Sequence, residues 1–138
     1  MTQKPLPRGL RNNNPGNIVK SRQRWLGEVA GDDPRFCTFS SMAYGYRALV
    51  KLLQNYQRTH KLYTIRQLIS RWAPATENRT DAYFAAVSRQ TGFDQEQRLD
   101  LNDRNTMVQL AAAISKVENG VPANMDDVAR GWYLLKVE

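Results

Sequence analysis

The stretch at residues 105–120 limits the fold most strongly, because its apolar residues recur at helical spacing. A helix over this stretch carries one apolar stripe, formed by Met107, Leu110, Ala111, Ile114 and Val117. Asn102 or Asp103 can cap its start, and Gly120 stands where a glycine commonly ends a helix. The sequence therefore predicts a helix with one buried face, against which the other elements pack.

Glu118 lies on or beside this stripe, in the last turn of the predicted helix. Contact with the core and the negative end of the helix dipole both disfavour an ionised carboxylate there. An acid that keeps its proton can protonate the leaving oxygen of a glycosidic bond. The alternative is a glutamate on the helix rim that reaches water, as most glutamates do. The spacing alone leaves both roles open.

Length and composition indicate one globular domain. The chain has 138 residues, of which 24% are charged and 41% hydrophobic, and this is enough for a core. We expect residues 1–10, with two prolines and a glycine, to be a flexible lead-in, and residues 11–138 to form a single domain. No apolar run approaches the roughly 20 residues of a membrane-spanning helix. The N-terminus lacks the apolar segment of a secretory signal, so none is expected.

The chain predicts a mostly helical α+β fold with a small antiparallel β element near its N-terminus. Short apolar pieces separated by turn residues favour two or three strands, at residues 17–19, 25–29 and 36–39. Helical spacing and capping residues predict the helices, which begin after Ser40 or Ser41, at Thr64, after Thr80, at residue 105 and near Met125.

Several chemistries lack the residues that they need. One histidine, His60, and one cysteine, Cys37, are too few for a zinc cluster, and no nucleotide-binding motif occurs, so no metal or cofactor is predicted. A single cysteine excludes an internal disulfide and fits a reducing compartment. The net charge of +7 favours a polyanionic partner, either nucleic acid or an anionic cell wall. Scattered cations without a recognition motif argue against nucleic acid.

Acidic residues are the remaining chemical resource. Glu28, Asp32 and Asp33 fall in the predicted hairpin region, where turn chemistry and solvent exposure are expected for the Asp pair. Glu77 lies in a loop between two helices, together with a polar set formed by Asn78, Thr80 and Tyr83. This loop is either a pre-helix turn favoured by the helix dipole or the polar wall of a cleft.

From Arg8 onward the chain resembles small phage- and prophage-encoded proteins that begin RGLRNNNPGNI. Those proteins continue with W-x-G, F-x-x-F, a G-x-R-A helix and WAPxxENxT. The matching pieces here are residues 8–18, 25–27, 36–39, 45–48 and 72–80, so the joint pattern covers nearly the whole chain. Such proteins are often described only as virion or structural proteins, and the resemblance therefore implies a phage context.

A second, more distant resemblance is to goose-type lysozymes, lytic transglycosylases and flagellar-type glucosaminidases. In these enzymes a helix ending in E-S/N-x-G carries the catalytic acid and precedes two strands, a helix and a tyrosine-bearing segment. Here similar elements occur in rotated order, with AAAISKVENG last. The resemblance implies a circularly permuted lysozyme-like domain, with Glu118 as general acid and Tyr83 as a cleft tyrosine whose hydroxyl can contact the acid.

The same resemblance leaves the second carboxylate open between Glu28, by position, and Glu77. Lytic transglycosylases can work with a single acid/base, so neither is obligatory. We expect the β element and the Glu77 loop to flank one groove with Glu118 at its floor. The substrate-binding residues expected along this groove are Asn17, Asn78, Thr80 and Tyr83.

The sequence thus predicts an enzyme that cleaves peptidoglycan between N-acetylmuramic acid and N-acetylglucosamine, by hydrolysis or transglycosylation. Glycan strands are the expected partner, without nucleic acid, and a monomer is expected. Such a protein is made in the bacterial cytoplasm and acts at the periplasmic wall, or is carried in a virion. The alternative is a non-catalytic virion structural or wall-binding protein.

Overall fold

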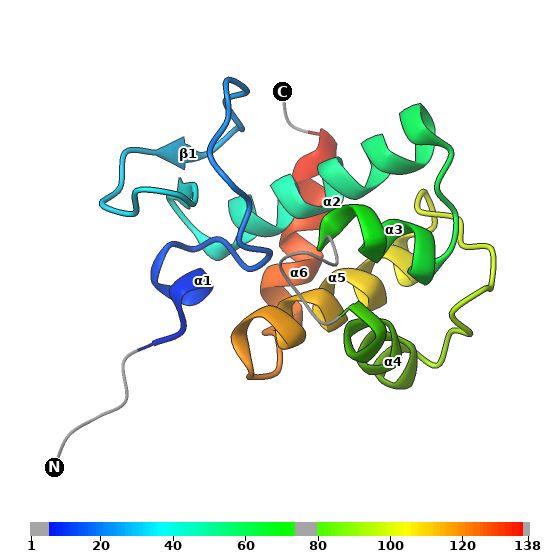
Figure 1. The fold of residues 1–138 in the computed structure, drawn as a ribbon. Helices are drawn as coiled ribbons and strands as arrows, with labels where there is room; N and C mark the ends of the chain where they lie inside the picture. The colour runs from blue at the N-terminus through cyan, green and yellow to red at the C-terminus, as the bar shows by residue number, and fades with distance from the viewer. Residues whose placement is uncertain (1–5, 74–79, 137–138) are drawn as a thin grey trace, which may run out of the picture.

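The computed structural model describes residues 6–73 and 80–136 of the chain. Within these residues it is mostly helical with a two-stranded antiparallel sheet, as the sequence predicts. Figure 1 shows β1 and α1 on one side of the helical body and α4 on the other. None of the described helices is long and apolar enough to cross a membrane.

Helix α5 (Arg104–Asn119) lies at the centre of the core and confirms the prediction made from residues 105–120. Asp103 caps it by accepting a hydrogen bond from the Thr106 amide at 3.0 Å, and Gly120 ends it with a left-handed φ of 74°. Its buried face includes Met107, Leu110 and Ile114, all fully shielded from solvent. Burying side chains of this size contributes about 1.5–3 kcal/mol each.

Helix α2 (Met42–His60) packs against α5 and α6 (Met125–Tyr133). Ser41 caps α2, in agreement with the predicted start, and the buried face of the helix includes Tyr46 and two leucines beyond it. The Tyr46 hydroxyl contacts the Ser115 hydroxyl at 2.8 Å and so joins α2 to α5 inside the core. Gly131 allows α6 to approach α2 closely, because a Cβ there would overlap the backbone at Tyr46 and Arg47.

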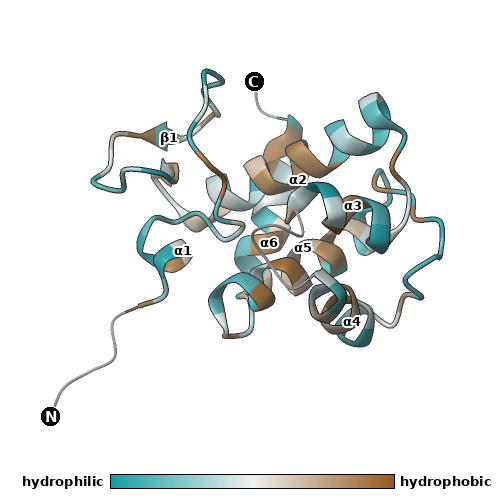
Figure 2. Cartoon of the chain, in the orientation of Figure 1, coloured by the Kyte–Doolittle hydropathy of each residue, from teal (hydrophilic) through white to brown (hydrophobic). Residues whose placement is uncertain are grey.

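Two shorter helices complete the core. Helix α3 (Ile65–Trp72) is capped by Thr64 and buries Ile65, and α4 (Thr80–Thr91) buries Tyr83 and Phe84. Helix α4 lies against both α3 and α5, and a 3-10 turn at Leu134–Lys136 follows α6. Figure 2 shows hydrophobic residues gathered where the helices face one another. The amphipathic spacing in the sequence accounts for this arrangement.

The sheet has two strands, within the two or three predicted, and both strands are shorter than predicted. It consists of β1 (Glu28–Val29) and β2 (Thr38–Phe39), and Glu28 pairs with Phe39. The strand expected at residues 17–19 is wrong, since only an isolated bridge between Val19 and Phe36 forms there. The left-handed φ of 52° at Asn17 interrupts the extended backbone that a strand requires.

Asparagine side chains hold the loop at residues 13–18, where a third strand does not form. The Asn14 amide donates to the Ile18 and Cys37 carbonyls at 3.0 and 2.9 Å, and the Asn13 amide donates to the Phe39 carbonyl at 3.0 Å. The loop also lies directly on the start of α2, because a Cβ at Gly45 would overlap the Asn13 carbonyl. Hydrogen bonds of side chains to backbone therefore fix this loop between the sheet and α2.

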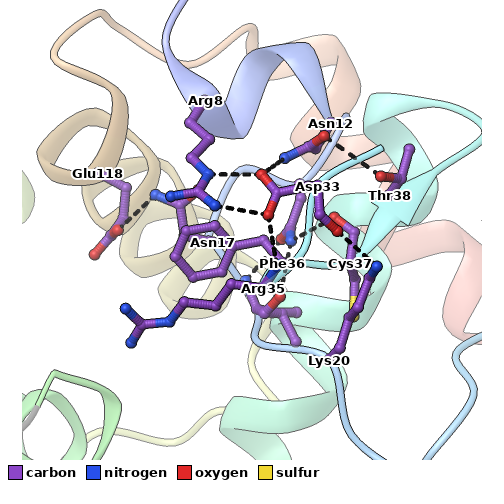
Figure 3. A network of polar contacts seen from close by, with 12 residues as sticks. Arg8, Asn12, Asn17, Lys20, Asp33, Arg35, Phe36, Cys37, Thr38 and Glu118 are labelled. Atoms are coloured by element: carbon purple, nitrogen blue, oxygen red, sulfur yellow. Dashed lines mark hydrogen bonds and ion pairs between the residues drawn. The ribbon is translucent and has the colours of Figure 1, made fainter. Parts of the chain in front are cut away.

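Helix α1 (Arg8–Arg11) is tied to the loop before β2 by Asp33. The Arg8 guanidinium donates to both Asp33 oxygens, at 2.6 and 2.7 Å, and the Asn12 amide donates to one of them at 2.9 Å (Figure 3). Arg8 also lies 4.4 Å above the centre of the Phe36 ring. Residues 8–10, which were expected to belong to the lead-in, are thus held against the body by a bidentate ion pair.

Asp33 also corrects an expectation. Its turn role is confirmed, since it accepts from the amides of Arg35 and Phe36 at 2.9 and 2.8 Å. Its predicted solvent exposure is wrong, because only 8% of the side chain is exposed, whereas the neighbouring Asp32 is exposed. A partner 25 positions away is not visible in a local turn pattern.

Asp33 predicts a specific acid sensitivity. Hydrogen bonds from Arg8 and from the loop amides hold the pKa of the Asp33 carboxyl well below its usual range. This stabilisation is complete above about pH 5 and is lost as the pH falls below the unfolded-state value of about 3.9. Asp33→Asn should therefore lower the unfolding temperature at pH 7, and the difference from the wild type should shrink towards pH 2. Asp32→Asn is the matched control, and a difference independent of pH would contradict this assignment.

Candidate active site

The carboxyl group of Glu118 is held by two side chains from distant parts of the chain. Its Oε1 accepts a hydrogen bond from Asn17 Nδ2, and its Oε2 accepts one from Tyr83 Oη, both at 2.8 Å. Asn17 lies 101 positions away in the sequence, and Figure 3 shows its amide directed at the carboxyl group. Glu118 is half-buried and held on both oxygens, which is not the freely solvated rim position of the alternative.

The neighbouring Asn119 places the loop that carries Asn17. The Asn119 side chain is 6% exposed and donates to the Pro15 carbonyl at 3.0 Å and to the Ser115 carbonyl at 2.9 Å. Gly9 leaves room for this contact, since a Cβ there would overlap the Asn119 amide oxygen. Asparagine tolerates the left-handed backbone that Asn17 adopts. The last turn of α5 therefore binds the loop twice, through adjacent side chains.

Tyr83 reaches Glu118 from α4. Its side chain is buried, and burial together with the nearby Glu118 carboxyl raises the pKa of the Tyr83 phenol well above its ordinary value. The phenol is therefore neutral across the physiological range and serves as a hydrogen-bond donor. The contact that the sequence predicted between this tyrosine and the acid is present.

Glu118 faces a cavity of about 400 Å³. Its walls come from the loop at residues 16–25, from Arg35 and Phe36, from α2 and from the end of α3. Aromatic side chains occupy four positions of the lining, at Trp25, Phe36, Tyr56 and Trp72. Among the described residues of this lining, Glu118 alone carries a carboxyl group. Concave sites with aromatic walls and a few fixed polar groups are typical of ligand-binding sites.

The other predicted site residues lie elsewhere or outside the described residues. Glu28, in β1, does not line the cavity; its side chain is 6% exposed and accepts from the Trp25 amide at 3.1 Å and from Arg24 at 3.3 Å. Glu28 lies near the Cys37 thiol instead, and burial of the thiol, together with this carboxyl group, raises the pKa of Cys37 to about 11. Thr80 is half-buried at the start of α4, and Glu77 and Asn78 lie outside the described residues.

Asn17, which the sequence predicts to bind substrate, lines the cavity, and its side-chain amide also donates to Glu118. Tyr56 and Trp72 are half-buried; both pack against the core and also line the cavity, a role that the sequence did not predict. The contact of Asn119 with Pro15 was also missed, and the only sequence feature that pointed to it was the place of Asn119 next to Glu118.

The chain was compared with known proteins. No family model matches it. Over 129 residues it is 36% identical to Protein P5 of Pseudoalteromonas phage PM2, and the match covers 91% of this chain and 79% of that protein. The chain therefore belongs to the family of this phage protein.

The hydrogen bond between Tyr83 and Glu118 is testable without any activity assay. Tyr83→Phe should lower the free energy of unfolding in urea by about 1–2 kcal/mol, because it removes the donor to Glu118 Oε2. In a double-mutant cycle with Glu118→Ala, a coupling energy of about 1 kcal/mol is expected. Tyr133→Phe is the control, since Tyr133 is 54% exposed and its hydroxyl bonds to none of the described residues. Zero coupling would mean that this contact does not hold the acid.

Proposed function

We propose that this member of the Protein P5 family is a peptidoglycan-cleaving glycosidase, a muramidase or lytic transglycosylase, with Glu118 as its general acid. The observation that carries the proposal is the setting of Glu118, which lines a cavity while both of its oxygens are held. A fixed carboxyl group in a concave site is the arrangement that general acid catalysis requires. The domain over residues 11–138 is, on this proposal, a circularly permuted lysozyme-like fold.

In the first step Glu118 gives its proton to the oxygen that joins C1 of N-acetylmuramic acid to N-acetylglucosamine. The C1–oxygen bond breaks, its electron pair stays on the departing oxygen, and positive charge develops at C1. Water or the C6 hydroxyl of the muramic acid then bonds to C1, and the proton that it loses returns to Glu118. Asn17 and Tyr83 act as positioning residues, because they hold the carboxyl group in place through both transfers.

The choice between the two products depends on a second carboxylate. Attack by the C6 hydroxyl can proceed with one acid/base, and Glu118 is the carboxyl group that the described lining supplies. Hydrolysis with a second carboxylate requires a separation of roughly 5–9.5 Å from the acid. Glu77 is the remaining candidate for that role beside Glu28, and residue 73, a few positions before it, lines the cavity.

The cavity walls also suit a glycan. Flat aromatic faces such as those of Trp25 and Trp72 can stack on sugar rings, and polar groups at the rim can bind hydroxyl and acetamido groups. A net charge of +7 attracts the protein to an anionic cell wall, and this attraction weakens with salt. The site of action is then the periplasmic wall, reached from the infected cell or from a virion.

A second candidate function is a non-catalytic virion structural or wall-binding protein. One observation favours it, because both oxygens of Glu118 bind protein groups and Asn17 belongs to a loop that the same turn clamps. These contacts would also serve a purely structural clamp. Cleavage of purified cell wall by the wild-type protein separates the two functions.

Removing the acid tests the proposed role directly. Glu118→Gln keeps the shape of the side chain and an acceptor oxygen, but an amide has no proton acidic enough to transfer to the leaving oxygen. Cleavage of purified sacculi should therefore fall by at least about 10²-fold. The unfolding temperature should stay near that of the wild type. Glu96→Gln is the matched control, because Glu96 is exposed and its carboxyl group pairs with Arg66, away from the cavity lining. Cleavage by Glu118→Gln at the wild-type rate would make Glu118 structural.

The two other glutamates test the second carboxylate. Glu28→Gln should retain most cleavage, because Glu28 is bound within its own loop and does not line the cavity. Glu77→Gln should have the larger effect if Glu77 activates water. The rate of release of soluble glycan fragments measures both. Full activity of both variants would favour the mechanism with one acid/base, and a larger loss in Glu28→Gln would reverse this ranking.

A further inference from the structure

A second cavity, of about 750 Å³, lies between α4 and α5. Its lining includes Ala82, Tyr83, Ala86, Arg89, Lys116 and Val117. The α4 residues recur at helical spacing, so one face of α4 forms one wall. The two alanines on this face are small, and together with Val117 they give the cavity an apolar floor.

Two cations give this cavity its charge. Arg89 and Lys116 are both exposed, and neither forms an ion pair with any of the described residues. No acidic side chain is among the described residues of the lining. Two cations that have no ion-pair partner in the described part of the chain, beside an apolar floor, suit a ligand that carries carboxylates and small aliphatic groups.

The linings of the two cavities are in contact at the proposed acid. Tyr83 lines the second cavity, and its hydroxyl donates to Glu118, which lines the first. Val117 and Glu118 are consecutive residues and face different cavities. A group that branches from a glycan bound in the first cavity can therefore reach the second across the last turn of α5.

We propose that the second cavity binds the acidic peptide that branches from the muramic acid of the substrate. Carboxylates of this peptide pair with Arg89 and Lys116, and its alanyl methyl groups lie against Ala82 and Ala86. This assignment rests on the proposed function, because it takes peptidoglycan as the ligand. It adds that the protein recognises strands that carry peptides better than bare glycan.

The test measures retention on insoluble sacculi and on glycan strands stripped of peptide by an amidase. The full chain carrying Glu118→Gln is used as the parent, so that the strands stay intact. Arg89→Gln and Lys116→Gln in this parent should bind intact sacculi about tenfold more weakly, while their binding to stripped strands equals that of the parent. Arg58→Gln and Lys51→Gln, which remove exposed cations of α2, are the matched controls and should change neither. Arg89→Lys, which keeps the charge, should bind nearly as the parent does.

Two kinds of binding result would overturn the assignment. Equal losses on both ligands, or equal losses in the control variants, would mean that the two cations attract the wall through charge alone. No loss in either variant, or no binding of sacculi by the parent, would mean that the cavity does not take the peptide. Peptide-dependent retention by a protein whose wild type cleaves nothing would refute the proposed function and leave the assignment standing.

Discussion

The last turn of α5 connects two ends of the chain, and the shape of the candidate site depends on that connection. Glu118 accepts from Asn17 and Asn119 donates to Pro15, across sequence separations of 101 and 104 positions. Without these contacts the loop at residues 13–18 would keep its bonds to the sheet but lose its register on α5. That loop supplies one wall of the first cavity, so the same turn provides the carboxyl group and holds the wall that adjoins it.

The Glu118 carboxyl group therefore has a structural role, and on our proposal it also has a catalytic one. A hydrogen bond within a protein contributes about 0.5–1.5 kcal/mol to stability, so the two bonds to Glu118 stabilise the fold whether or not the carboxyl group reacts. An acid that must transfer protons also has to keep its orientation, and donors from Asn17 and Tyr83 provide that. A purely structural role for Glu118 would not require a cavity with aromatic walls beside it.

The helices were predictable from the sequence because their determinants are local. Apolar spacing placed α5, and the capping residues Asp103 and Thr64 lie within one turn of what they cap. The short sheet was overestimated, since side chains of Asn13 and Asn14 make contacts that a strand pattern assigns to backbone. The ion pair of Arg8 with Asp33 could not be read from local sequence at all. Glu118 was found because a buried stripe ends in a carboxyl group, and its contact with Tyr83 was found through resemblance. Asn17 was expected along the groove as a substrate-binding residue, but its hydrogen bond to Glu118 was not predicted, because the two residues are 101 positions apart.

The central claim is that Glu118 acts on a glycan bound in the first cavity and so cleaves a glycosidic bond. The chemical structure of the released fragments tests this claim most directly. Purified peptidoglycan digested by the wild-type protein is analysed by mass spectrometry. The proposed mechanism predicts fragments that end at N-acetylmuramic acid, either with a reducing end from water or with a 1,6-anhydro ring from attack by the C6 hydroxyl. Intact glycan strands after prolonged digestion, or fragments cut only in their peptides, would contradict it.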